Sequence, residues 1–309
     1  MAKTVTQPPN MENIGKFRKS FLLECWQNEY AEHFLQTLRE KEAKRPVSTL
    51  SSPQVKYRGF LILNMRRVTS RLALGGRVLH AGVRLLDIFM DGFVVSEDRL
   101  LHVALICLLI ATKFEVKGMK VPRFSEFCEE ADTKELSHSE LWSLEWNVLQ
   151  HMRWDLCTPT AATFVEFYRP VAVCRQDYED WKLKISQGVI TYERFKKNVN
   201  TSIKDFLNLT LSDMRFTRYP PSLVAAACVQ AMRIHFGLIP WPPLLYKITS
   251  HPLESVNPKA VLLYKMMMVN NNRINSGRKR RYSTSEDDQG YCTAKSSPES
   301  KRPCTGTES

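Results

Sequence analysis

The stretch SEDRLLHVALICLLIATKF, residues 96–114, decides the fold expected for this chain. Ser96 and Asp98 suit the beginning of a helix, and the residues that follow are apolar on nearly every side. A helix without a polar face must be surrounded by other elements, so we expect 96–114 to be the buried centre of a helical domain. Its apolar run is shorter than the roughly 20 residues that cross a bilayer, so no membrane partner is expected.

The segments around this central helix have the apolar periodicity of amphipathic helices. The expected helices are about 54–73, about 77–91, one that begins at Pro122, and 137–153. A weaker repeat of the pattern follows, with one helix from Pro159, one or two within 178–213, and a second small apolar run, SLVAAACV, within 221–236. The chain is therefore expected to be all-α, with two five-helix units that each surround a buried third helix.

Changes in composition divide the chain into four expected parts. Residues 1–53 are expected to be an N-terminal helical segment, with apolar periodicity over 12–44, and a Ser- and Pro-rich linker. The first five-helix unit covers 54–156 and the second covers 157–269. Hydrophobic residues nearly vanish from Asn270, so 270–309 is expected to be a disordered basic tail.

The net charge of +12 has an uneven distribution. Residues 43–86 contain no Asp or Glu but nine Lys and Arg, whereas the tail from Val269 holds eight basic and five acidic residues. A basic surface near the first helices favours acidic or phosphorylated partners. A merely solvated basic face is the alternative, and the sequence leaves both open.

No pattern in the sequence indicates catalysis or metal binding. The eight cysteines form no C-x-x-C pair, and the seven histidines form no ligand cluster. Phosphate-binding G-x-x-x-x-G-K, H-E-x-x-H and G-x-S-x-G motifs are absent. We expect no cofactor, no metal and no enzymatic activity, and a compartment in which thiols stay reduced.

Four charged residues fall on helix faces that the periodicity assigns to burial. Arg58 precedes Leu61 on the inward face of the first expected helix, and Asp87 lies on the inward face of the second. A buried charge is costly unless it is paired, so we expect Arg58 and Asp87 to pair with each other. Lys113 and Glu145 are expected at the rim of an apolar surface, where they could hold a helix of a partner. A favourable cation at the C-terminal end of its helix is the alternative for Lys113.

At these residues the chain resembles the cyclins. The runs that carry the resemblance are YRGFLILNMRRV, VLHAGVRLLDIFMD, ALICLLIATKFEV, LEWNVLQHMRWDLCTPTAATFVEFY, YPPSLVAAACVQAMRI and HPLESVNP. They occur in the family's order and span about 20–268. The resemblance implies two tandem cyclin boxes and a cyclin-dependent protein kinase as the partner, activated allosterically.

The resemblance also implies roles for single residues. Arg58 and Asp87 match the ion pair that braces the first cyclin box, and Lys113 and Glu145 match the pair that binds the regulatory helix of the kinase. The apolar wall beside that pair is matched by Ile110, Phe114, Leu149, Trp154 and Leu156. Plain core packing is the alternative for these five residues.

Many cell-cycle cyclins carry a docking groove for Arg-x-Leu peptides on the first helix. The matching residues here are Tyr57, Phe60, Leu61, Asn64, Arg67 and Leu101. Asn64 stands where those cyclins have a tryptophan, and Arg67 stands where they have an acidic residue. We therefore expect weak binding of Arg-x-Leu peptides and better binding of acidic or phosphorylated motifs.

The basic cluster Arg278, Lys279, Arg280 and Arg281 resembles a nuclear import signal. It predicts a nuclear location, with the cytoplasm as a second location and a solvated basic cluster as the alternative. A second function stays open beside the kinase regulator. A cyclin-fold transcription regulator could bind nucleic acid through the basic stretch 43–86, or could bind a transcriptional kinase.

Overall fold

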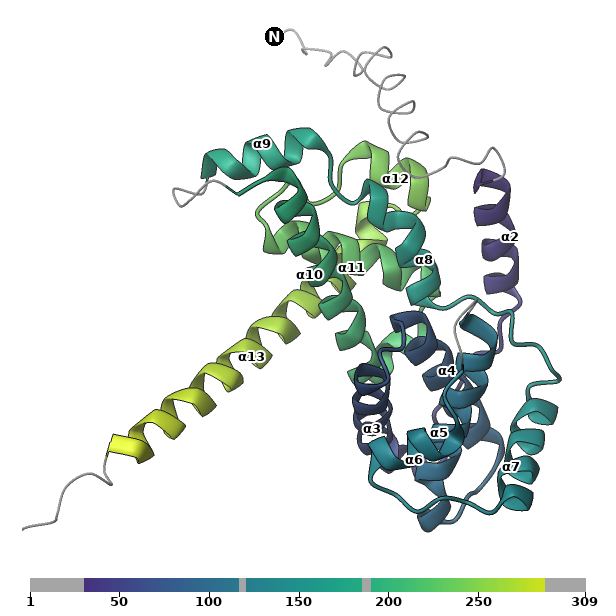
Figure 1. Cartoon of the computed structure of the whole chain (residues 1–309). Helices are drawn as coiled ribbons and strands as arrows, with labels where there is room; N and C mark the ends of the chain where they lie inside the picture. Colours follow the sequence, from purple (N-terminus) through teal and green to yellow (C-terminus); the bar gives the residue numbers. More distant parts are fainter. Residues whose placement is uncertain (1–30, 117–120, 185–189, 287–309) are drawn as a thin grey trace, which may run out of the picture. The chain divides into compact units, whose positions relative to one another are not determined.

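The computed structural model describes residues 31–116, 121–184 and 190–286, and the side chains of 32–272 within them (Figure 1). These residues form twelve α-helices and three short 3-10 helices, and no strand occurs among them. The prediction of an all-α fold is confirmed. The described residues up to Met267 form one compact unit, and those from Met268 onward belong to another.

The first group of helices surrounds α5. Its members are α3 (Arg58–Arg71), α4 (Gly76–Gly92), α5 (Glu97–Glu115), α6 (Phe124–Ala131) and α7 (His138–His151). Every residue of α5 from His102 to Thr112 is buried, as the apolar sequence predicts. Helix α4 can approach α5 closely because Gly82 has no side chain. A Cβ at this position would lie 3.2 Å from the Cα of Leu108.

The second group repeats this plan around α11. It contains α8 (Ala161–Tyr168), α9 (Arg175–Lys184), α10 (Tyr192–Ser212), α11 (Pro221–His235) and α12 (Pro243–Thr249). The 3-10 helices are η1 (Pro53–Tyr57), η2 (Arg169–Val171) and η3 (Met214–Arg218). All residues of α11 from Ser222 to Arg233 are buried, so the second small apolar run is the centre of the second core.

Helix α2 (Ala31–Ala43) packs against the second group, although it precedes the first group in the chain. The buried Glu42 carboxylate accepts hydrogen bonds from the backbone N–H and the hydroxyl of Ser222, at 2.6 and 2.7 Å. These bonds satisfy the first turn of α11, where helices have unpaired N–H groups. The predicted helical residues 12–30 lie outside the described part of the chain.

Helix α13 (Leu253–Glu286) extends beyond Asn270, where the disordered tail was expected to begin. The backbone is helical to Glu286, and residues 287–309 lie outside the described residues, so disorder of the tail stays a prediction. No described helix has the length and apolar character needed to cross a membrane.

Candidate functional site

Lys113 and Glu145 meet on the surface of the first group of helices. Lys113 lies in the last turn of α5, and its Nζ is 2.5 Å from Oε1 of Glu145 on α7. The Lys113 side chain is 49% exposed and the Glu145 side chain 18%. The two charges are therefore paired with each other but remain accessible at one edge.

Trp154 follows the end of α7, the helix that carries Glu145. The Trp154 N–H donates to the carbonyl of Leu149 at 3.0 Å, and the Arg153 N–H donates to that of Gln150 at 2.9 Å. Arg153 and Trp154 both have left-handed backbones, with φ of 49° and 61°. This conformation ends the helix in the manner of a Schellman motif and leaves the indole of Trp154 54% exposed.

Three tryptophans form a continuous exposed row beside the pair. Trp142 stacks on Trp146 with ring centroids 6.3 Å apart, and Trp146 meets the ring of Trp154 edge-on at 5.7 Å. Their exposed fractions are 64, 46 and 54%. We call Trp142, Trp146 and Trp154 the tryptophan row.

Of this row, only Trp154 is implied by the family resemblance. Trp142 and Trp146 are four residues apart, and both lie off the inward stripe that includes Val148. Two aromatic residues at helical spacing on an outward face were the signal that could have found them.

The other residues of the predicted apolar wall differ in their accessibility. Phe114 is 43% exposed beside Lys113, whereas Ile110 is only 2% exposed and belongs to the first core. Leu149 and Leu156 are partly buried against that core. Ile110 is therefore corrected from a contact residue to a core residue, because it lies on a helix that is enclosed along most of its length.

Arg58 and Asp87 form the buried pair that the sequence predicts. Nε of Arg58 is 2.7 Å from Oδ1 of Asp87, and Nη2 is 2.9 Å from Oδ2, so the contact is bidentate. The two side chains are 4 and 6% exposed. The third nitrogen, Nη1, donates to the backbone carbonyl of Leu211 at the end of α10.

The predicted docking patch on α3 is only partly accessible. Phe60 and Arg67 are exposed, and Tyr57 and Leu101 are partly buried. Leu61 and Asn64 are corrected to buried residues, because they share the inward face of α3, and the Asn64 amide donates to the carbonyl of Phe60. Leu63, which is not among the predicted docking residues, is 65% exposed on the outer face of the same helix.

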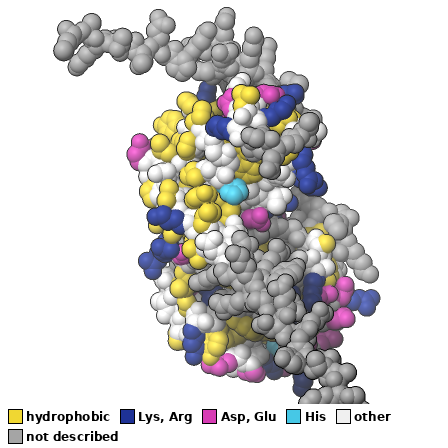
Figure 2. All heavy atoms as spheres, turned by 90° about the vertical axis from the view of Figure 1, so that its left-hand side faces the viewer, with side chains coloured by type: hydrophobic (Ala, Val, Ile, Leu, Met, Phe, Trp, Pro, Cys, Tyr) yellow, Lys and Arg dark blue, Asp and Glu magenta, His cyan; other side chains and the backbone are white. Residues whose placement is uncertain are grey.

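Basic residues of the segment 43–86, which contains no Asp or Glu, form ion pairs with acidic residues elsewhere in the chain. Arg71 pairs with Glu130 at 2.9 Å, and Arg77 pairs with both Glu115 and Glu166, at 2.6 and 3.1 Å. Figure 2 shows one face of the molecule, on which the described Lys and Arg side chains are dispersed among other types. The excess charge in the sequence is thus partly neutralised by the fold.

Two further expectations concern other parts of the chain. The backbone of Arg278, Lys279, Arg280 and Arg281 is helical, but their side chains lie outside the described ones, so nuclear import stays a prediction. In the part of the chain that the structure describes, no three His, Cys, Asp or Glu side chains lie close enough to hold a metal ion.

Two tandem helical groups, each built on a buried central helix, define a two-box protein of the cyclin class. The family model "Cyclin, N-terminal domain" matches residues 32–157, and "Cyclin, C-terminal domain" matches residues 159–299. The chain therefore belongs to the cyclin family. This membership supports a regulatory role for the protein.

Within the family, the chain is similar to proteins named Cyclin-J. It is 34% identical to Cyclin-J of Xenopus laevis over 83% of this chain and 66% of the relative, and 31% identical to Cyclin-J of Homo sapiens over 83 and 65%. It is 26% identical to the G2/mitotic-specific cyclin-A of Drosophila melanogaster over 76% of this chain and 44% of that protein. The chain thus spans about two thirds of the length of the two Cyclin-J proteins.

A solved structure shows the same fold. The crystal structure of a viral cyclin from herpesvirus saimiri matches with a TM-score of 0.58 at 18% identity, over 75% of this chain and 95% of the viral chain. At this level of identity the likeness concerns the fold alone.

Proposed function

We propose that this protein is the regulatory subunit of a cyclin-dependent serine/threonine protein kinase, which it binds and activates allosterically. The observation that carries the proposal is the accessible Lys113–Glu145 pair, which lies at the edge of the exposed tryptophan row. Helix-binding surfaces commonly combine an apolar centre with charges at the rim.

The energetics of the pair favour a role in binding over a role in folding. An exposed ion pair contributes about 0–1 kcal/mol to stability. Lys113 and Glu145 can therefore give up their contact with each other and bind groups of a partner at little cost in folding stability. Exposed Trp side chains, by contrast, can contribute strongly to the free energy of binding when a partner buries them, because buried aromatic residues dominate many interfaces. Phe114 and the tryptophan row together offer such a surface.

In the proposed mechanism the phosphoryl-transfer site lies wholly on the kinase. The cyclin would contact the regulatory helix of the kinase and bind the active conformation more tightly than the inactive one. This difference in affinity would shift the kinase towards the state in which the glutamate of that helix pairs with the lysine of the ATP site. No group of the cyclin takes part in the chemistry.

We also propose that the protein acts in cell-cycle control and in the nucleus. The likeness to a G2/mitotic-specific cyclin-A supports the first part, and the basic cluster at 278–281 supports the second. A fluorescent fusion of the full chain should accumulate in nuclei. Replacement of Arg278, Lys279, Arg280 and Arg281 by alanine should abolish this accumulation, whereas equal accumulation of the two proteins would contradict the import role.

The nucleic-acid alternative is less well supported by the described side chains. Arg58, Arg71 and Arg77 are held in ion pairs within the fold and cannot contact phosphates without breaking them. Binding to duplex DNA with a steep dependence on salt concentration would favour this alternative.

A direct binding measurement tests the proposal. The full chain should bind at least one member of a panel of purified cyclin-dependent kinases, and Glu145→Ala should weaken that binding at least tenfold. Glu130→Ala is a matched control, because Glu130 also forms an accessible ion pair between helices of the first group, at 2.9 Å from Arg71. Equal losses in the two variants, or no binding by the wild type, would contradict the proposal.

A further inference from the structure

The linker between α2 and η1, residues 44–52, is bound to the first cyclin box by the carboxylate of Asp91, which lies on α4. Oδ2 of Asp91 accepts a hydrogen bond from the Ser48 hydroxyl at 2.6 Å. It also accepts bonds from the backbone N–H groups of Thr49 and Leu50, at 2.6 and 3.1 Å. Partial burial raises the pKa of Asp91, but these bonds together hold it below its usual value, so the carboxylate is charged at neutral pH.

The linker has few other attachments. Residues 45–51 have no regular secondary structure, and Val47 is 51% exposed. Among the described backbone N–H groups of 45–51, only those of Arg45, Thr49 and Leu50 donate a hydrogen bond. Leu50 has a left-handed backbone, with φ of 50°, which a leucine rarely adopts. Loss of the bonds to the carboxylate on α4 would therefore free this part of the chain.

The sequence around Ser48 has the pattern of a kinase acceptor site. Lys44 and Arg45 stand four and three residues before Ser48, and the intervening Pro46 and Val47 are exposed. Kinases distinguish substrates partly by charge pattern, and a basic residue at this spacing suits a kinase with an acidic substrate pocket. A segment without regular secondary structure can also bind as an extended peptide. Ser48 is half-buried, so a kinase reaches it when the linker opens briefly.

We infer that Ser48 is a phosphorylation site for an arginine-directed serine kinase, and that its phosphate releases the linker from the first cyclin box. In the reaction, Oγ of Ser48 forms a bond to the γ-phosphorus of ATP while the bond from that phosphorus to the departing ADP breaks. The hydroxyl proton passes to the catalytic base of the kinase. That kinase is defined by its recognition of arginine, so the inference does not depend on the proposed function.

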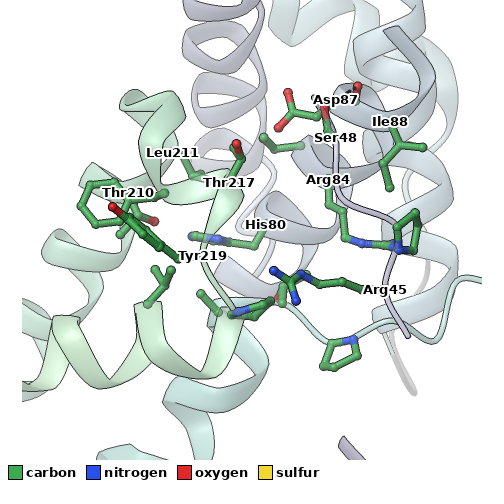
Figure 3. A pocket seen from close by; sticks show the side chains of 18 of the residues that line it. Arg45, Ser48, His80, Arg84, Asp87, Ile88, Thr210, Leu211, Thr217 and Tyr219 are labelled. Atoms are coloured by element: carbon green, nitrogen blue, oxygen red, sulfur yellow. Dashed lines mark hydrogen bonds between the residues drawn. The ribbon is translucent and has the colours of Figure 1, made fainter. Parts of the chain in front are cut away.

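Phosphorylation would replace an attraction with a repulsion. Ser48 would lose the proton that it donates to Asp91, and a group of roughly −2 charge would stand against the charged carboxylate. The carbonyl oxygen of Asp87 is 3.3 Å from Oγ of Ser48, and the carboxylates of Asp87 and Asp91 are close enough to interact. Figure 3 shows Ser48 next to Asp87. A phosphate at this position would therefore face acceptor oxygens rather than donors.

Two arginines, Arg45 and Arg84, line the same pocket as Ser48. Neither forms a hydrogen bond with Ser48 among the described contacts. Arg45 donates to the carbonyl of Glu42 at 3.3 Å, and Arg84 interacts with Asp155. Figure 3 shows Arg45 well apart from Ser48. The two arginines could hold a phosphate on Ser48 only by leaving these positions, and the test below distinguishes this outcome from release.

The linker connects parts of the protein that belong to different cyclin boxes. Helix α2 packs against the second group of helices, where Glu42 binds Ser222, whereas the linker that follows is bound to α4 of the first group. Phosphorylation would leave the contact of Glu42 in place and remove the attachment at Asp91. The modification would thus loosen one connection between the two boxes.

The first experiment tests whether Ser48 is an acceptor. The full chain is incubated with ATP and each of a panel of purified arginine-directed serine kinases, and mass spectrometry locates the phosphate. At least one kinase should modify Ser48, and Arg45→Gln should lower the rate of this modification at least tenfold. Arg169→Gln, which removes an exposed arginine of η2, should leave the rate unchanged. Absence of phosphate from Ser48 with every kinase, or equal rates in the two variants, would overturn the site.

The second experiment measures release by hydrogen exchange at the amides of Thr49 and Leu50, because these two groups bond to Asp91. Phosphoserine introduced at position 48 during synthesis should accelerate both exchanges at least tenfold. In Asp91→Asn the repelling charge is absent, so the same modification should accelerate them less than threefold. Phosphoserine at position 139, an exposed serine of α7, adds the same charge elsewhere and should leave both rates unchanged.

Each outcome of the exchange measurement decides the inference. Equal rates with and without phosphoserine at position 48 would show that the phosphate does not release the linker. Slower exchange after the modification would show that Arg45 and Arg84 hold the phosphate in place, and would also overturn the release. The comparison within the unsubstituted chain needs no variant, so it remains decisive if Asp91→Asn fails to fold.

Discussion

Nη1 of Arg58 donates a hydrogen bond of 2.8 Å to the backbone carbonyl of Leu211. The other side of the same guanidinium neutralises Asp87, so one buried side chain serves both the core of the first box and the contact with the second. Leu211 itself belongs to the core of the first box, although it lies on α10. The interface of the two boxes is thus part of the hydrophobic core rather than a loose junction.

Replacing Arg58 should destabilise the protein strongly. Arg58→Met leaves the Asp87 carboxylate buried without a counter-charge, and we expect a loss of about 3–5 kcal/mol in the free energy of unfolding. Urea denaturation followed by circular dichroism measures this loss. The double variant Arg58→Met/Asp87→Leu removes both charges and should recover most of it. A double variant as unstable as Arg58→Met would contradict this account of the pair.

The stability of the protein should fall as the pH is lowered through the range of histidine titration. The pKa of His80 is about 3 in the folded protein and 6.5 in an ordinary histidine. Below pH 6.5 the unfolded chain therefore binds a proton that the folded chain does not. The free energy of unfolding should decrease by up to about 1.4 kcal/mol per pH unit from this group.

Burial also lowers the pKa of His251, to about 4, and this group acts in the same direction. Urea midpoints at pH 7.5, 6.0 and 5.0 measure the combined slope. In His80→Gln the slope should be distinctly smaller, whereas His138→Gln, which changes an exposed histidine of α7, should keep it. An unchanged slope in His80→Gln would show that His80 does not resist protonation.

Peptide binding at α3 should differ from that of cyclins with an acidic docking groove. Arg67 and Phe60 are exposed on α3, and a positive charge repels the arginine of an Arg-x-Leu peptide. We expect weak binding of such a peptide in fluorescence anisotropy, and stronger binding in Arg67→Glu. Tight binding of the Arg-x-Leu peptide by the wild type would refute this prediction.

The tryptophan row should contribute to kinase binding but not to folding. Trp146→Ala should weaken binding to the partner kinase by about ten- to a hundredfold, because buried tryptophans at interfaces each contribute several kcal/mol. The free energy of unfolding should change by less than about 1 kcal/mol, since the ring is 46% exposed. Isothermal titration calorimetry gives the first value and urea denaturation the second.

Tyr246→Ala is the matched control for this prediction. Tyr246 is an aromatic residue of the second box with a similar exposure, 54%. It should leave kinase affinity unchanged. Equal affinity of Trp146→Ala and the wild type would exclude the row from the interface.

Periodicity and charge placement predicted much of the fold. An apolar run such as that of α5 is compatible with one arrangement, a helix enclosed by other elements. A charged side chain on an inward face needs a partner of opposite charge. The pair of Arg58 and Asp87 followed from these two rules. Lys113 and Glu145 came from the same reasoning together with the family resemblance.

Features that depend on distant contacts could not be predicted in this way. Arg233 and Asp177 form a second buried ion pair, 2.7 Å apart, but Asp177 lies among several charged residues of α9 and gave no sign of burial. The hydrogen bond from Arg58 to the carbonyl of Leu211 is likewise absent from any local pattern, since α3 and α10 come together only when the two boxes pack.

The most direct test of the central claim is phosphate transfer by purified cyclin-dependent kinases in the presence of a charge-swapped protein. Lys113→Glu/Glu145→Lys keeps an ion pair within the cyclin and therefore its stability, but it presents each charge at the position of the other. The account predicts that the wild type stimulates at least one kinase of the panel and that the swapped variant, folded and equally stable, stimulates it at least tenfold less. Equal stimulation by the two proteins would contradict it.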